Sequence, residues 1–183
     1  PCPNAAFGDE TEKFVPNPAC VSESHLDRFK FLGQLMGASA RTGTGFIELD
    51  LPSFVWKMLL RESAGVHELA SVDSRTAAML ELATSADEET WVAATAEQPF
   101  VWCVRLVDGR VISLRGNGTE TVAFADRGTY VEKTVSAWVA QFSAQIDALR
   151  SGLFAVLPEL ATRLLTWREL ERRVCGHADV SVA

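Results

Sequence analysis

Long apolar runs are missing from this chain of 183 residues, although 48% of its residues are hydrophobic. No uninterrupted apolar stretch reaches the ~18 residues that a membrane-spanning helix needs. The first residues, PCPNAAFGDETEKF, also lack the basic and apolar regions of a secretory signal. We therefore expect a soluble, cytoplasmic protein that has no membrane partner and folds around one core.

An excess of basic residues is also missing. The chain has 17 Lys and Arg against 24 Asp and Glu, which gives a formal net charge of -7, and its basic residues are scattered. A surface that binds nucleic acid needs clustered positive charge to neutralise phosphates. We therefore expect no nucleic-acid partner.

Cysteine is too sparse and unevenly spaced for a disulfide framework, so we expect reduced thiols. The cysteines are Cys2, Cys20, Cys103 and Cys175. None of them is paired at the spacing of a zinc knuckle, and the histidines stand far apart. Cys175 and His177 come nearest to a ligand pair, but a cysteine beside a glycine at a helix end usually packs. We predict no metal and no cofactor.

Periodic apolar positions are missing from residues 1–23, which hold Pro1, Pro3, Pro16 and Pro18. Proline restricts its own backbone and that of the preceding residue, so a segment of this kind cannot form a regular helix. We expect an extended lead-in that lies on the domain, with Phe14 and Val15 as its anchors.

Apolar residues at helical spacing then predict three helices, at about residues 24–40, 52–62 and 73–85. In the first of them Gly33 and Gly37 are four residues apart on the apolar face. Glycine at these positions allows the backbone of a neighbouring element to come close. We therefore expect this helix to be buried, and its apolar positions are Phe29, Leu32, Leu35 and Met36.

The pattern changes between Trp91 and Phe124, where apolar residues alternate or cluster in short runs. Asp108-Gly109 lies between two such runs, and this dipeptide is typical of a hairpin turn. A second turn is expected at Arg115–Thr119. The region therefore predicts two strands joined as a β-hairpin.

Helical spacing returns after Asp126 and predicts one long amphipathic helix to about residue 151. Gly152 is expected to end or bend it, and a further helical segment is expected at residues 160–165. Thr166 and Glu169 form the pattern of a capping box, which predicts a last helix that ends near Val174, before Gly176.

Several motifs follow one another in an order that is typical of a known family. They are Phe31-Leu32-Gly33, Leu49-Asp50-Leu51-Pro52, Trp56-Lys57, Val72-Asp73-Ser74, Glu169-Leu170-Glu171 and Cys175-Gly176. In this order they resemble the large N-terminal lobe of HECT-type ubiquitin ligases.

The resemblance implies an α+β fold that is mainly α-helical, a HECT N-lobe with a small inserted β-hairpin subdomain. It implies a domain over residues 24–183, within which residues 73–125 would bind a ubiquitin-conjugating enzyme. In this family the cysteine that accepts ubiquitin by transthiolation, and passes it to a substrate lysine, lies in a separate C-terminal lobe. No cysteine here has that context, so we expect no catalytic residue, and the fragment alone should be inactive.

The resemblance also implies which residues would contact the conjugating enzyme through a shallow apolar groove. They are Thr76, Met79, Leu80 and Ala83 on the expected third helix, Trp91 on a strand after it, and Tyr130 at the start of the long helix. Thr76 and Ala83 are smaller than is common in the family, which predicts a shallower groove. Ubiquitin would be a further partner, and protein substrates would bind through other regions.

Other interpretations of the same residues stay open. Met79 and Leu80 could be core residues, and Tyr130 could belong to the buried stripe of its helix. The chain could be a degenerate, non-catalytic HECT-like interaction module. It could also be an unrelated helical enzyme that uses Cys175 as nucleophile and His177 as base.

Overall fold

The computed structural model describes residues 13–176, and the described chain divides into two compact units. The first unit holds residues 13–63 and 142–176, and the second holds residues 64–141. The α+β, mainly helical character expected from the sequence is confirmed, because helices dominate and one small two-stranded sheet is present in the described part. Pro1, Pro3, Cys2 and His177 lie outside the described residues.

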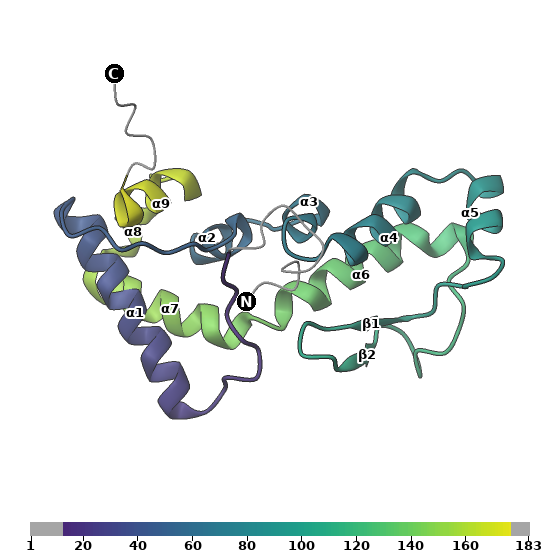
Figure 1. Ribbon diagram of the computed structural model, residues 1–183, viewed down its shortest axis with the longest axis horizontal. Coiled ribbons are helices and arrows are strands. Elements are labelled where there is room, and N and C mark those ends of the chain that lie inside the picture. Colours follow the sequence, from purple (N-terminus) through teal and green to yellow (C-terminus); the bar gives the residue numbers. More distant parts are fainter. Residues whose placement is uncertain (1–12, 177–183) are drawn as a thin grey trace, which may run out of the picture. The chain divides into compact units, whose positions relative to one another are not determined.

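The first unit is helical, and two of its helices lie side by side in Figure 1. Its elements are α1 (Glu23–Thr42), α2 (Ser53–Leu59), α7 (Ser143–Val156), α8 (Glu159–Thr162) and α9 (Trp167–Cys175). The neighbouring pair is α1 and α7, and both α2 and α9 pack on this pair. The helices α1, α2 and α9 confirm three elements expected from the sequence, whereas α8 is shorter than expected.

Glycine sets the distance between α1 and α7. A Cβ atom on Gly33 would lie 2.0 Å from the carbonyl oxygen of Leu149, and one on Gly152 would lie 1.9 Å from that of Lys30. The close approach expected at Gly33 is therefore confirmed. The expectation that Gly152 ends or bends a helix is wrong, because Gly152 lies inside α7, where its lack of a side chain allows the contact.

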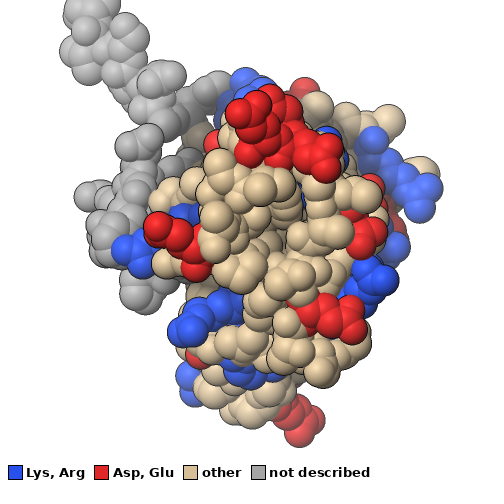
Figure 2. Space-filling view, turned by 90° about the vertical axis from the view of Figure 1, so that its right-hand side faces the viewer, with Lys and Arg blue, Asp and Glu red and all other residues tan. Residues whose placement is uncertain are grey.

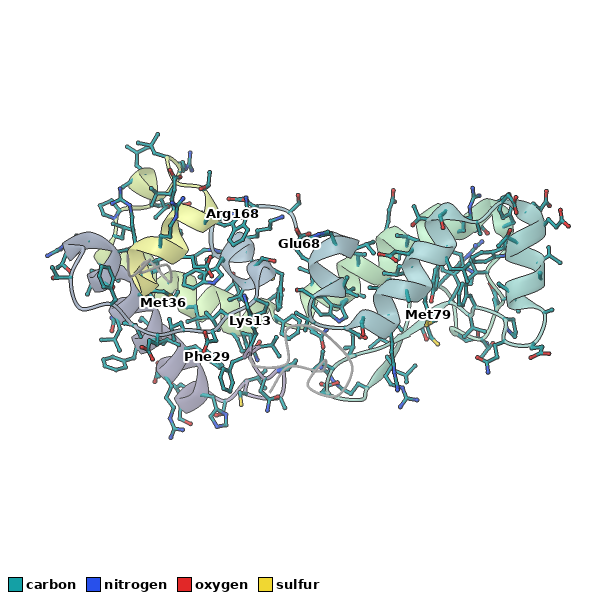
Figure 3. The ribbon with its side chains drawn as sticks, turned by 45° about the horizontal axis from the view of Figure 1, so that its top comes forward. Lys13, Phe29, Met36, Glu68, Met79 and Arg168 are labelled. Atoms are coloured by element: carbon teal, nitrogen blue, oxygen red, sulfur yellow. The ribbon has the colours of Figure 1, made fainter. Side chains whose placement is uncertain are left out.

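The helix α1 is less buried than its sequence pattern predicted. Met36 is buried, and Phe29 and Leu32 are half-buried, but Leu35 is exposed, as is its neighbour on the preceding turn, Phe31. Figure 3 labels Phe29 and Met36. The difference arises because the buried face follows the small residues that contact α7, which leaves the larger apolar residues on either side of this face.

The lead-in is held by its backbone and by prolines. The Phe14 N–H donates to the Asp50 carbonyl at 2.7 Å, but the Phe14 side chain is 58% exposed. Pro16 and Pro18 are buried instead, and Val15 is half-buried. Phe14 is therefore not the side-chain anchor that we expected, because a buried proline packs its ring without requiring a backbone donor to be satisfied.

The second unit carries a hairpin and most of the remaining helices. Its elements are α3 (Val66–Ala70), α4 (Ser74–Ser85), α5 (Glu88–Thr95), β1 (Cys103–Arg105), β2 (Val111–Ser113), the 3-10 helix η2 (Phe124–Asp126) and α6 (Arg127–Ala140). The two strands are antiparallel, with Val104 opposite Ile112. Gly109 in the connecting turn has φ 84°, so the predicted hairpin and the role of its Asp-Gly turn are confirmed.

Two expectations about this region are wrong. Trp91 lies on the helix α5 and not on a strand, because the Asp87 carboxylate accepts the Thr90 N–H at 2.8 Å and caps the helix. The expected long helix is two helices, since α6 ends at Ala140 and α7 begins at Ser143. At the end of α6 the Gln141 side chain donates to the Trp138 carbonyl at 2.7 Å and so terminates the helix.

The last helix begins as its sequence predicts. The Thr166 hydroxyl accepts the Glu169 N–H at 3.3 Å, and the Glu169 carboxylate accepts the Thr166 N–H at 2.8 Å. This reciprocal pair confirms the capping box. The helix ends at Cys175, and Gly176 follows with φ 82°. Among the described helices none is long and apolar enough to cross a membrane.

Candidate functional site

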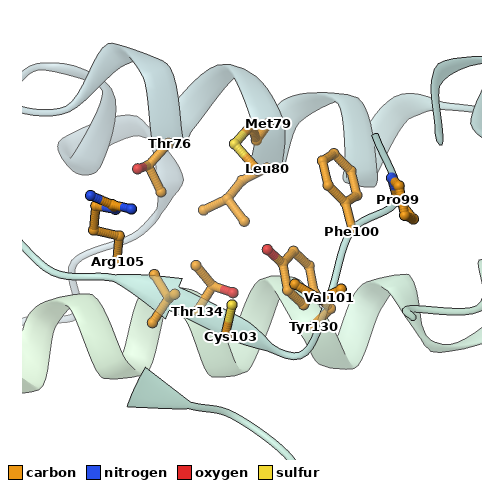
Figure 4. Close-up of a pocket in the computed structure, with 11 residues that line it drawn as sticks. Thr76, Met79, Leu80, Pro99, Phe100, Val101, Cys103, Arg105, Tyr130 and Thr134 are labelled. Carbon is orange, nitrogen blue, oxygen red and sulfur yellow. The ribbon is translucent and has the colours of Figure 1, made fainter. Parts of the chain in front are cut away.

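The second unit contains a pocket of about 230 Å³ that lies between α4, α6 and the chain that leads into β1. Figure 4 shows the residues around it. The lining residues are Thr76, Met79, Leu80, Pro99, Phe100, Val101, Cys103, Val104, Arg105, Tyr130 and Thr134. Most of them are apolar, and Arg105 is the one charged residue in this set.

The wall formed by α4 is fixed at its N-terminus. The Asp73 carboxylate accepts the Thr76 N–H at 3.0 Å and the Thr76 hydroxyl at 2.7 Å, so Thr76 is tied to the cap of its own helix. Met79 is 43% exposed and Leu80 is buried. This arrangement places Leu80 in the wall and leaves Met79 accessible to a partner.

The opposite wall is formed by α6 and an aromatic cluster. Tyr130 is buried, and its ring stacks on Phe100 with centroids 5.9 Å apart. Trp102 meets Tyr130 edge-on at 5.8 Å, and Trp91 meets Phe100 edge-on at 5.1 Å. Aromatic pairs at these distances add packing energy beyond simple burial. The cluster therefore fixes the ring of Tyr130.

The segment before β1 is held by backbone hydrogen bonds. The Val122 N–H donates to the Phe100 carbonyl at 2.8 Å, and the Trp102 N–H donates to the Glu120 carbonyl at 3.1 Å. The hairpin is tied to α6 as well, because the Lys133 ammonium donates to the Leu114 carbonyl at 3.2 Å. The segment before β1 and its hairpin, which form one wall of the pocket, are therefore attached to α6, which forms another.

The expected contact residues fall into two groups. Four of the six, Thr76, Met79, Leu80 and Tyr130, line this pocket. Ala83 is 0% exposed and Trp91 is 3% exposed, and neither lines it. Trp91 instead supports the pocket from behind through Phe100. Val92, its neighbour on α5, is exposed.

Sequence reasoning missed the lining residues that come from the segment before and within β1, and it missed Thr134. Thr134 follows Tyr130 by four residues on the same helix, so helical spacing could have identified it. Phe100 and Cys103 carry no such signal, because their position depends on how the segment before the hairpin pairs with residues 120–122.

Burial controls the protonation of Tyr130. Loss of solvent raises the pKa of the Tyr130 phenol above its ordinary value, an effect that the nearby Thr134 hydroxyl partly offsets and the Cys103 thiol reinforces. The phenol is therefore neutral at physiological pH, and its hydroxyl is available as a hydrogen-bond donor inside the pocket.

The other chemistry considered from the sequence receives little support. Burial raises the pKa of the Cys175 thiol, and this disfavours the thiolate that a nucleophile needs. His177, its expected base, lies outside the described residues. Among residues 13–176 no group of three or more His, Cys, Asp or Glu residues is arranged to hold a metal ion.

Known proteins resemble this chain over almost its whole length. Residues 4–183 match the family model described as HECT-domain (ubiquitin-transferase). The E3 ubiquitin-protein ligase HERC2 of Mus musculus is 30% identical over 173 residues, which cover 94% of this chain and 4% of that protein. The E3 ubiquitin-protein ligase NEDD4 of Rattus norvegicus is 26% identical over 188 residues, which cover 98% of this chain and 20% of that protein.

The chain thus spans a small part of the length of these relatives. The match to the family model covers nearly all of its residues, and it agrees with a mainly helical fold that carries a small antiparallel hairpin. The chain belongs to the HECT-domain family of ubiquitin transferases.

Proposed function

We propose that this chain is part of a HECT-type ubiquitin-protein ligase and that its second unit docks a ubiquitin-charged conjugating enzyme. A cysteine outside these 183 residues would accept ubiquitin by transthiolation and pass it to a substrate lysine. This chain would then supply binding and positioning, and the reacting thiol would come from elsewhere in the ligase.

One observation carries this proposal: four of the six residues that the family resemblance assigns to the conjugating enzyme line one pocket. Thr76, Met79 and Leu80 come from α4, and Tyr130 comes from α6, far along the chain. A few aromatic and aliphatic anchors usually carry most of the energy of a protein interface. A pocket of about 230 Å³ with apolar walls suits one large apolar side chain of the partner.

The exposed surface around the pocket supports the same function. Met79 and Val92 are large apolar residues that remain exposed on α4 and α5. The face shown in Figure 2 is largely uncharged at its centre, with acidic side chains gathered near its upper edge. Exposed apolar residues such as Met79 and Val92 are typical of the centre of a protein interface, where charged residues are depleted.

The degenerate-module alternative loses part of its basis. It relied on small residues at Thr76 and Ala83, but Ala83 is buried and does not line the pocket, so its size cannot make the pocket shallow. Thr76 alone remains, and its hydroxyl is already bonded to Asp73. We therefore favour a functional docking surface over a degenerate one.

Calorimetric binding of this chain to a panel of ubiquitin-conjugating enzymes tests the proposal. Met79→Asp should weaken the binding of a responsive enzyme about 30-fold, because it places a charge where an apolar contact of about 2 kcal/mol is lost. Met79 is preferred to the buried Leu80 because a charge at Leu80 would threaten folding.

Val111→Asp is the matched control. Val111 is 55% exposed on β2 of the same unit and does not line the pocket. The affinity of the Val111→Asp chain for the conjugating enzyme should therefore stay unchanged. A folded chain that binds no member of the panel, or that binds equally well after Met79→Asp, would refute the docking role.

A further inference from the structure

The pocket has a polar floor that the docking of an apolar side chain does not use. Cys103 on β1 is a free, half-buried cysteine that lines the pocket together with Tyr130 and Thr134. Figure 4 shows the Cys103 sulfur and the two hydroxyl oxygens directed into the space beneath Leu80. A thiol and two hydroxyls therefore meet at the base of an apolar pocket.

The Thr134 hydroxyl points to an absent ligand. Thr134 is 1% exposed, and in the part of the chain that the structure describes its Oγ1 makes no hydrogen bond of normal geometry. A buried hydroxyl without a partner is costly, and native proteins usually satisfy such groups. A polar atom of a ligand in this pocket would satisfy it.

The Tyr130 hydroxyl can serve the same ligand atom. It remains protonated at physiological pH and can donate a hydrogen bond, and Cys103 lines the same pocket. The pocket thus combines apolar walls, two hydroxyls suited to an oxygen atom, and a thiol that can form a covalent bond.

We propose that Cys103 is a covalent modification site for small apolar α,β-unsaturated carbonyl compounds that bind in this pocket. The Cys103 sulfur forms a bond to the β-carbon of the compound while the carbon–carbon π bond breaks. Its electron pair takes up, at the α-carbon, the proton that the thiol loses. Nothing is oxidised and no group leaves. The carbonyl oxygen accepts hydrogen bonds from Tyr130 and Thr134.

The pocket distinguishes Cys103 from the other cysteines that the structure describes. Cys20 does not line it. Cys175 does not line it either, and burial raises the pKa of its thiol. Among the three cysteines that the structure describes, Cys103 alone lets the apolar part of a compound gain affinity from this pocket, so selectivity should depend on the size of that apolar part.

An adduct at Cys103 would occupy the space between Met79, Leu80 and Tyr130. It would then block the conjugating enzyme. This consequence rests on the proposed docking function, whereas the modification itself does not.

The test compares two maleimides that share one reactive group. The purified chain is treated with N-ethylmaleimide or N-cyclohexylmaleimide, and the labelling rates of Cys103 and Cys20 are measured by peptide mass spectrometry. The ratio of the Cys103 rate to the Cys20 rate should rise about tenfold with the cyclohexyl compound, because several more apolar carbons become buried. An equal ratio for both compounds, or no labelling of Cys103, would overturn the proposal.

Two variants test whether the labelling of Cys103 depends on the Thr134 hydroxyl or only on the exposure of the thiol. Thr134→Val keeps the shape of the side chain but removes its hydroxyl. With N-cyclohexylmaleimide, it should lower the ratio of the Cys103 rate to the Cys20 rate about fivefold. Thr84→Val, on the exposed side of α4 and outside the pocket, should leave the ratio unchanged. Circular dichroism confirms that each variant is folded. A fall that is equal in both variants would contradict the role of Thr134.

Binding of the conjugating enzyme is measured separately, with labelled chain and with labelled Cys103→Ser chain. Labelling should lower the affinity of the wild-type chain at least tenfold relative to the same chain before labelling. The same treatment should not lower the affinity of the Cys103→Ser chain relative to its own untreated form. If the unlabelled chain binds no enzyme, the docking function fails while the maleimide ratios still decide the modification site.

Discussion

Single glycines decide how closely the two main helices of the first unit approach each other. The contacts at Gly33 and Gly152 leave no room for a methyl group, and the nearest atoms belong to the backbone of the other helix, which cannot rotate away. The absence of a Cβ atom at these residues therefore stabilises the helix pair, although each glycine lowers helix propensity by about 1 kcal/mol.

Gly33→Ala should destabilise the chain by about 2 kcal/mol or more, because α1 and α7 must separate to admit the new Cβ atom. Urea unfolding followed by circular dichroism measures this loss. Gly128→Ala on α6 is the control, since a Cβ there meets nothing within 4 Å and the change should be neutral or slightly stabilising. Equal effects of the two substitutions would show that close packing is not the cause.

A second residue-scale prediction concerns the cap of α9. Hydrogen bonds from the backbone and hydroxyl of Thr166 hold the pKa of Glu169 below its ordinary value. A carboxyl group with a lowered folded-state pKa stabilises the fold above its unfolded-state pKa, and this stabilisation is lost as the pH falls through the folded-state pKa. Glu169→Gln should therefore destabilise the chain at neutral pH, and the difference should disappear in acid.

The measurement is urea unfolding of both chains at a series of pH values. Thr166→Ala removes the other half of the capping box and should cost about 1 kcal/mol at neutral pH. A Glu169→Gln effect that stays constant from neutral to acidic pH would contradict the account.

Secondary-structure elements were predictable where a local signal is strong. The Asp108-Gly109 turn determined the hairpin, and Thr166 with Glu169 determined the start of α9. The helix α5 was missed because Trp91 and its apolar neighbours suit a strand equally well, and the cap formed by Asp87 decides between the two. The end of α6 was missed because it depends on Gln141, whose side chain also accepts the Val107 N–H of the hairpin.

The candidate site shows the same division. Residues carried on α4 and α6 could be placed because the family resemblance assigns Thr76, Met79, Leu80 and Tyr130 to this surface. Phe100 and Cys103 could not, because the segment that carries them is positioned by pairing with residues distant in sequence. The helical side of this pocket can therefore be predicted from the sequence, and the side formed by the irregular segment before β1 cannot.

The acidic start of α5 predicts how a partner approaches. Asp87, Glu88 and Glu89 are exposed, and hydrogen bonds from Thr90 lower the pKa of Asp87, so it stays charged at neutral pH. We expect the docking surface of the partner to be basic. Glu88→Lys combined with Glu89→Lys should then slow association with the conjugating enzyme roughly three- to tenfold at low salt, and much less at high salt.

Stopped-flow or interferometric association rates measure this effect. The matched control reverses two exposed acidic residues of the first unit, Asp27 and Glu48. If both double variants slow association equally, net charge and not the α5 segment is responsible.

The chain as a whole should bind without performing transfer. When the ubiquitin-charged conjugating enzyme is mixed with this chain, no thioester between ubiquitin and the chain should form. The described thiols lack the sequence context of the family's catalytic cysteine, and partial burial also raises the pKa of the Cys175 thiol. Non-reducing electrophoresis detects such a thioester. A band that disappears on reduction, and is absent after Cys175→Ala, would instead revive the assignment of Cys175 as nucleophile.

The central claim is that the pocket of the second unit is the docking surface, and hydrogen–deuterium exchange with and without the conjugating enzyme tests it most directly. We predict slower exchange in residues 76–80, 99–105 and 130–134. We predict no change on α8 of the first unit and in the turn after it, where Leu160 and Leu164 are exposed. Protection confined to the first unit, from an enzyme shown to bind, would contradict the account.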